Sequence, residues 1–239
     1  MVSERRTTQD LVAEWERKLR AYSEAFAPLG EWDMRPPAND SAVVNDLRDA
    51  LLEMFVVMVA GEKAYRDNWF KQPGVRNWVY GHGVACVSKK LQTAFEFGVD
   101  IQGFLMSTEL LYPQHLRRMT NAFWDKFLKL GEIGNLTYRP NVSVSTAHGE
   151  DADKLKSKSE MFRVIRDAVL LESDHSTEIG DMGGLDVRWF GSTPVGEVVV
   201  RGGDALRILW ELNYELYRAE YQLRHGRRTS SLVANDTNT

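Results

Sequence analysis

Apolar residues recur at helical spacing over two stretches in the N-terminal quarter of the chain. In the first stretch the apolar residues come after the segment Thr7-x-x-Asp10 and continue to about Ala27. This pattern is typical of a capping box, in which each side chain bonds the backbone of the other residue, so we expect a helix to begin there. The second stretch, from Ser41 to about Tyr65, is apolar on nearly all sides. A helix of that kind lies at the centre of a core.

The middle of the chain has both helical and extended patterns. We expect a helix over Val84–Phe97, and another that begins at Pro113, because proline suits the first position of a helix. Residues 136–144 alternate between apolar and polar, which predicts a strand. Residues 146–159 are polar and charged, which is typical of a mobile loop or a domain boundary.

The C-terminal third predicts two helices separated by two strands. The first helix is expected over Glu160–Glu172. Residues 185–190 and 197–201 have strand patterns, and the Gly-Ser-Thr-Pro-Val-Gly segment between them predicts a hairpin. The last helix is expected from Asp204 to about His225, before a polar tail that should be disordered.

These elements together predict a mainly α, multi-helix globular domain with a small β-hairpin near the C-terminal helix, so that any α+β character is minor. The expected organisation is a helical domain over 1–145, a mobile loop or boundary over 146–159, a helix–hairpin–helix region over 160–225 packed on that domain, and a disordered tail over 226–239.

Composition excludes some classes of protein without identifying an activity. The 239 residues are 43% hydrophobic, which allows a sizeable core, and the net charge of −4 argues against non-specific nucleic-acid binding over a broad basic surface. Cys86 is the single cysteine, so neither an intrachain disulfide nor a cysteine zinc site can form. No acidic or histidine grouping has the spacing of a known metal loop, and no cofactor fingerprint is present, so we expect neither metal nor cofactor.

The sequence has no pattern for secretion or for membrane insertion. Its first residues are polar, and the longest apolar run, Leu51–Ala60, contains Glu53 and is too short to span a bilayer. We therefore expect a cytoplasmic or virion protein that has no membrane partner and is not secreted by a classical signal.

One short stretch has an arginine–asparagine pair followed by a histidine: Arg76, Asn77 and His82. A guanidinium can stabilise charge that develops on a phosphodiester, and a neutral imidazole can accept a proton. The stretch resembles the signature of the HEPN family of helical ribonucleases. That resemblance implies metal-independent RNA cleavage in a composite site of two protomers. His82 would handle the proton of a 2'-hydroxyl, Arg76 would stabilise the scissile phosphate, and Asn77 would orient the pair.

The last predicted helix has an apolar surface over more than half of its circumference. Leucines form one face, and a second face is formed by Trp210, Tyr214, Tyr217 and Tyr221. A core can accommodate the leucine face, whereas tyrosine and tryptophan suit a half-buried interface, which predicts a homo-oligomer or another bound partner. The alternative is that both faces pack within the chain.

A further group combines arginine with aromatic residues. Arg117 and Arg118 precede Trp124 in the helix expected from Pro113, and Arg188 adjoins Trp189. Such side chains can hold a single-stranded backbone and stack on bases, which makes single-stranded RNA a candidate partner. The alternative is that these are surface cations whose stems lie along apolar surface.

Two functional hypotheses follow from the sequence, which leaves open whether the protein is an enzyme. The first is a non-catalytic helical assembly or interaction protein, including an oligomer-forming, coat- or nucleocapsid-like structural subunit of a virus or mobile element. The second is a HEPN-like ribonuclease that uses Arg76 and His82. Convergence of Arg76 and His82 on a concave, two-fold surface would favour the enzyme. A His82 that points into solvent, with Trp210, Tyr214 and Tyr217 at a subunit contact, would favour assembly.

Overall fold

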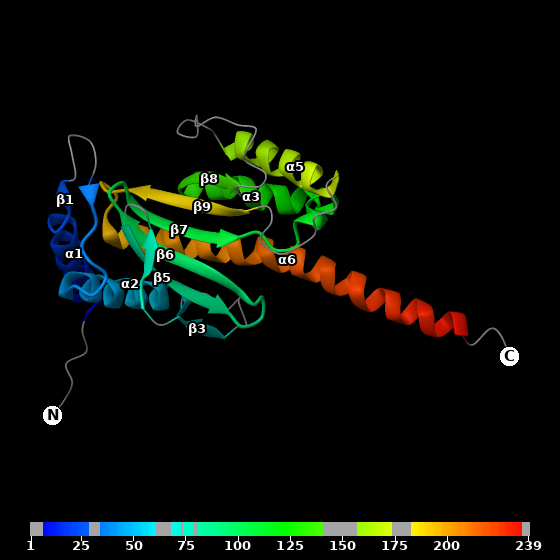
Figure 1. Cartoon of the computed structure of the whole chain (residues 1–239), viewed down its shortest axis with the longest axis horizontal. Coiled ribbons are helices and arrows are strands. Elements are labelled where there is room, and N and C mark those ends of the chain that lie inside the picture. The colour runs from blue at the N-terminus through cyan, green and yellow to red at the C-terminus, as the bar shows by residue number, and fades with distance from the viewer. Residues whose placement is uncertain are drawn as a thin grey trace, which may run out of the picture.

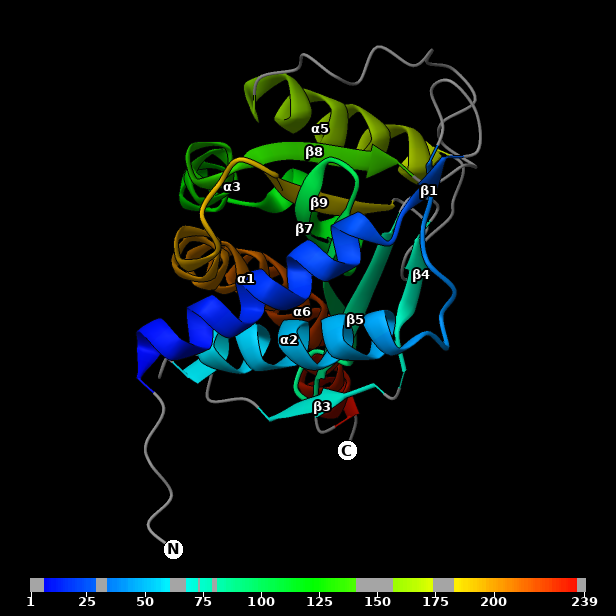
Figure 2. The same cartoon turned by 90° about the vertical axis from the view of Figure 1, so that its left-hand side faces the viewer.

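The structure, a computed structural model, describes residues 7–28, 34–60, 68–72, 74–78, 81–140, 157–173 and 183–235. Its centre is a seven-stranded antiparallel sheet, with helices packed along one face (Figures 1 and 2). The prediction of a mainly α protein with a small hairpin is therefore wrong, because the chain has an α+β fold.

The two N-terminal helices follow the apolar pattern of the sequence. Helix α1 (Thr8–Glu24) begins with the expected capping box, which is confirmed by reciprocal bonds of 3.2 and 3.0 Å between Thr7 and Asp10. Helix α2 (Ala42–Ala60) buries a continuous face in the core, as expected. Between them lies a small ribbon of β1 (Ala27–Pro28) and β2 (Met34–Arg35).

The strands of the large sheet come from the middle and the end of the chain. They are β3 (Trp69–Lys71), β4 (Arg76–Trp78), β5 (Gly81–Ser88), β6 (Thr93–Asp100), β7 (Gly103–Glu109), β8 (Asn135–Pro140) and β9 (Gly183–Phe190). Their order is β3-β5-β6-β7-β9-β8, and β4 also pairs with β5. Both regions predicted on either side of residues 146–159 thus contribute strands to the same sheet.

The helix predicted over Val84–Phe97 is wrong, because this segment forms the β5–β6 hairpin. Phe95, Phe97 and Val99 are buried and alternate with small or charged residues. That alternation has the period of a strand whose one face packs on a core. Cys86 also points into this core, where burial raises the pKa of its thiol to about 11.

The segment after β7 is helical in two pieces. Pro113 begins a short 3-10 helix, η2 (Pro113–Arg118), and the predicted α-helix starts only at α3 (Asn121–Ile133). Helix α5 (Ser157–Ser173) confirms the helix predicted over 160–172. Most of the predicted loop or boundary at 146–159 lies outside the described residues.

The predicted C-terminal hairpin is wrong. Strand β9 is present, but it pairs with β7 and β8, and the second predicted strand is the first part of α6 (Val195–Asn235). The valines there are compatible with a helix because Val198 packs in the core. Helix α6 passes along the helix-covered face of the sheet, here called the inner face, and the C-terminal half of α6 extends beyond the sheet (Figure 1). It continues past His225 into the segment predicted as a tail, of which residues 236–239 lie outside the described part.

Candidate binding groove and interaction surfaces

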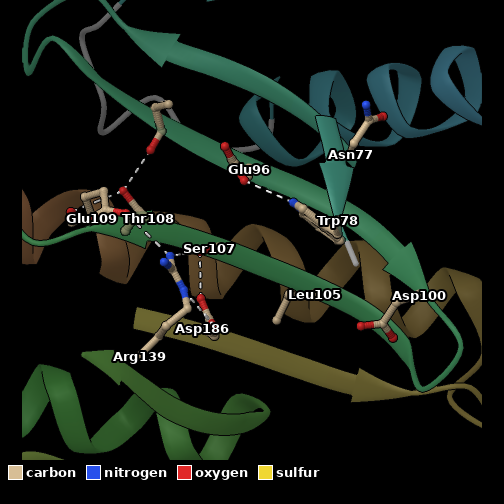
Figure 3. A pocket seen from close by; sticks show the side chains of 11 residues that line it. Asn77, Trp78, Glu96, Asp100, Leu105, Ser107, Thr108, Glu109, Arg139 and Asp186 are labelled. Atoms are coloured by element: carbon tan, nitrogen blue, oxygen red, sulfur yellow. Dashed lines mark hydrogen bonds and ion pairs between the residues drawn. The ribbon is translucent and has the colours of Figure 1, made fainter. Parts of the chain in front are cut away.

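The sheet face opposite α6, here called the open face, contains a cavity of about 500 Å³, here called the groove (Figure 3). Strands β6 and β7 form its floor, Trp78 of β4 lies at one side, and Arg139 of β8 and Asp186 of β9 lie at the other. A second hollow of about 530 Å³ shares Leu105 and Asp186 with it and reaches Phe190. Cavities of roughly 300–1,000 Å³ are the usual size of small-molecule sites, so this groove is a candidate binding site.

The position of Trp78 depends on two glycines that face each other in β5 and β6. Gly83 and Gly98 are paired across the hairpin, and the indole ring lies directly over them. A Cβ atom at Gly98 would lie 2.6 Å from this ring and even closer to the carbonyl oxygen of His82. The indole Nε1 donates a 3.2 Å hydrogen bond to Glu96. The side of the groove is therefore built by local packing that only glycine permits.

Ion pairs link strands on the same face, and three of the four span an intervening strand, whereas Arg139–Asp186 joins the neighbours β8 and β9. They are Arg76–Glu96 at 3.4 Å, Arg188–Asp100 at 2.6 Å, Arg139–Glu109 at 3.5 Å and Arg139–Asp186 at 3.4 Å. Burial opposes the charge of Arg139, but the carboxylates of Asp186 and Glu109 raise its pKa. Among the charged groups of the groove, carboxylates therefore outnumber guanidiniums.

Among the described residues that line the groove, the serine is not beside a histidine that could take its proton. Ser107 donates a 2.6 Å hydrogen bond to Asp186, whose carboxylate is also held by Arg139. A serine nucleophile needs a base that is free to take its proton, which is most often a histidine. No histidine lines the described part of this groove.

The residues of the predicted ribonuclease motif lie on strands. Arg76 and Asn77 are in β4, and His82 is in β5, where it pairs directly with Asn77. Because Arg76 pairs with Gly83, the next residue after His82, the two side chains point to opposite faces of the sheet. Arg76 is on the open face and contacts Glu96. Within one chain, the structure thus does not bring Arg76 and His82 together.

His82 is enclosed on the inner face, where only 1% of it is exposed. Its Nδ1 lies 2.8 Å from the Tyr22 hydroxyl, and its Nε2 lies 2.7 Å from Oδ1 of Asn39. Because an amide oxygen only accepts, Nε2 carries the proton and Nδ1 accepts from Tyr22. Burial lowers the pKa of His82, so the neutral ring is favoured.

The predicted aromatic face of the last helix forms a continuous row along α6. Ring centroids are 4.9 Å apart between Trp210 and Tyr214, 6.5 Å between Tyr214 and Tyr217, and 6.4 Å between Tyr217 and Tyr221. Trp210 is only 5% exposed, the next two tyrosines are half-buried, and Tyr221 is 51% exposed. The row thus begins in the core and ends on the exposed surface.

The three arginines predicted to contact RNA lie on two separate surfaces. Arg188 is paired with Asp100 on the open face of the sheet. Arg117 and Arg118 are exposed on η2, and Arg118 lines a separate pocket that also contains Arg218 of α6. Trp124 lies on α3 instead of the same helix as the arginine pair.

The sequence did not indicate the groove, because β5 and β6 were predicted as a helix and β9 as part of a separate hairpin, although the strand predicted over 136–144 overlaps β8. One signal was present: charged residues alternate with apolar ones at Glu96 and Asp100, and again at Asp186 and Arg188. Such alternation marks the polar face of a strand, but it does not reveal which strands are neighbours.

In the described part of the chain, no cluster of three or more histidine, cysteine, aspartate or glutamate side chains could hold a metal ion. None of the helices in those residues has the length and apolar character needed to cross a bilayer. The chain matches no family model, and no curated protein or solved structure is significantly similar to it.

Proposed function

We propose that this protein works by non-catalytic association and that the distal half of α6 joins it to a second copy of the chain. The observation that carries this proposal is the aromatic row, which continues from the core at Trp210 to the exposed ring of Tyr221. A helix that leaves the body of a protein loses the tertiary packing from which most helical stability comes. An aromatic row on such a helix is stabilised when a partner covers it.

The spacing of the row favours a second copy as the partner. Its accessible residues Tyr214, Tyr217 and Tyr221 are separated by three and four positions, whereas Trp210 is buried in its own chain. Alternation of three and four is the spacing of a coiled-coil seam, along which two identical helices pack row against row. A self-complementary surface of this kind generates a closed, two-fold dimer. The coat- or nucleocapsid-like role expected from the sequence would use such a dimer as its building unit and stays a prediction.

Sedimentation velocity over a concentration series tests the proposal. The wild-type protein should form a dimer, and Tyr221→Glu should weaken it roughly tenfold or more, because it places a charge in the seam. Val200→Glu is the matched control, since Val200 is an apolar residue of the same helix that is 68% exposed and lies outside the row. A wild-type protein that stays monomeric at the highest concentration would refute the proposal, as would equal dimerisation by both variants.

The ribonuclease hypothesis receives no support from the geometry of one chain, since His82 is buried and hydrogen-bonded on both ring nitrogens. It can be decided directly by incubating single-stranded RNA with the wild-type protein and with His82→Ala. Cleavage by the wild-type protein that His82→Ala abolishes, while the variant remains folded, would establish the enzyme and displace non-catalytic association as the function.

A further inference from the structure

A pocket of about 620 Å³ lies between η2, the start of α3 and the middle of α6. Its polar lining includes Arg118 from η2, Thr120 from the N-terminus of α3, and Arg218 and Gln222 from α6. The pocket is separate from the groove on the open face and from the aromatic row. Two guanidiniums that are far apart in the sequence are thus brought to one cavity.

The positive charges of this pocket are not compensated within the described part of the chain. Neither Arg118 nor Arg218 forms an ion pair with any described residue, and both are exposed. The carboxylate that lines the pocket, Glu215, is engaged by Lys126 at 2.7 Å. Two arginines with free hydrogen-bond donors therefore face a cavity in which the acid is already paired. Such guanidiniums are suited to bind the oxygen atoms of a phosphate in a bidentate manner.

The start of α3 adds donors of a second kind. Thr120 is the N-cap of this 13-residue helix, and its side chain makes no capping hydrogen bond. Phe123 already donates its N–H to the Thr120 carbonyl at 3.0 Å, so the donors left in the first turn are those of the residues before it, and the helix dipole makes this end positive. With an uncommitted hydroxyl at Thr120, the end of α3 can contribute to anion binding.

The buried side chain of His115 also lines this pocket, and one of its ring nitrogens is unpaired among the described residues. It lines the pocket, is 2% exposed, and bonds Glu220 through Nε2 at 2.8 Å. Its other nitrogen, Nδ1, has no hydrogen-bond partner among the described residues. Because Nε2 donates to the Glu220 carboxylate, Nδ1 of the neutral ring is an acceptor, and ordered solvent or a ligand with a donor group would satisfy it.

We propose that this pocket binds a phosphate group between Arg118, Arg218 and the N-terminus of α3. The phosphate could belong to a free anion or to the backbone of single-stranded RNA, and the pocket chemistry is the same for both. A single local site is compatible with the net charge of −4, because it needs no broad basic surface. The proposal does not depend on self-association through Tyr221.

Binding should be measured with the full-length protein and two probes, inorganic phosphate by titration calorimetry and a fluorescent single-stranded RNA by anisotropy. Arg118→Gln and Arg218→Gln should each weaken binding roughly tenfold, because each removes a charged, bidentate donor. Arg201→Gln is the matched control, since Arg201 is an α6 arginine away from the pocket that is paired with Glu197. It should bind like the wild-type protein.

The two probes identify the source of the phosphate. Binding of RNA without measurable binding of inorganic phosphate would assign the site to nucleic acid, and the reverse would assign it to a free anion. Thermal melting of each variant, together with sedimentation of Arg218→Gln, verifies that folding and assembly are unchanged. If neither probe binds the wild-type protein, or if both pocket variants bind as tightly as Arg201→Gln, the proposal is overturned.

Discussion

The hydroxyl group of Tyr22 in α1 donates a 2.8 Å hydrogen bond to Nδ1 of His82 in β5, and the two rings meet edge to face with centroids 5.7 Å apart. Asn39, just before α2, accepts the proton of the other ring nitrogen at 2.7 Å. His82 therefore connects the first helix, the start of the second helix and the sheet. A histidine with both nitrogens bonded in a buried site acts as a structural connection, which explains its place in this fold.

Removal of this imidazole should destabilise the protein. His82→Ala would leave the Tyr22 hydroxyl without its acceptor and Asn39 without its donor, and would open a cavity beneath α1, so we expect a loss of about 2–4 kcal/mol in the free energy of unfolding. The measurement is urea denaturation followed by circular dichroism. Asn77→Ala serves as the control, because Asn77 is the exposed strand partner of His82, and its loss should change stability by less than about 0.5 kcal/mol. Equal effects of the two substitutions would contradict this account.

The buried imidazole should also make stability depend on pH. Burial lowers the pKa of His82 in the folded state, whereas the unfolded chain has the ordinary value of about 6.5. The unfolded chain then binds more protons below about pH 6.5, so the stabilisation that is complete above that pH decreases as the pH falls toward the folded-state pKa. We expect a decline between about pH 7 and pH 5 that is smaller in His82→Asn than in the wild type. Parallel pH profiles for the two proteins would show that His82 is not responsible.

The glycines beneath Trp78 should not tolerate a methyl group. Gly98→Ala would force the new Cβ against the backbone of β5 and the indole ring, so we expect a loss of about 2 kcal/mol or more in the free energy of unfolding. The indole should also move, and tryptophan fluorescence would report this. In contrast, nothing lies within 4 Å of a Cβ at Gly196 in the first turn of α6. Gly196→Ala should therefore be neutral or stabilising by up to about 1 kcal/mol. The same loss of stability in both variants would argue against the packing role of Gly98.

The parts of the fold that the sequence predicted are those that depend on near neighbours. The capping box of Thr7 and Asp10 involves residues three positions apart, and the apolar periodicity of α2 is complete within one segment. The failures involve distant partners. Val198 to Val200 are β-branched and were predicted as a strand, but this segment is helical because Val198 packs in the core below the sheet.

The candidate site was predicted least well, for the same physical reason. The sequence does not show that Arg76 and His82 lie on opposite faces of the sheet, or that Ser107 bonds Asp186. Both relationships depend on strand register. A shift of one residue moves every side chain of a strand to the other face. The aromatic face of the last helix was recognised correctly because it lies on one element, but its gradient of exposure was not predictable.

By itself, the sequence determined where most helices lie, that a substantial core would form, and that one helix would carry an aromatic face, because these properties follow from residues close together in the chain. Only the tertiary structure decided that the middle of the chain forms a sheet, that His82 is internal, and that Arg118 and Arg218 line the same pocket beside α3. The physical reason is that strand pairing and pocket formation bring together segments separated by long stretches of chain. The structural preference of a short segment does not reflect the free energy of contacts with distant segments.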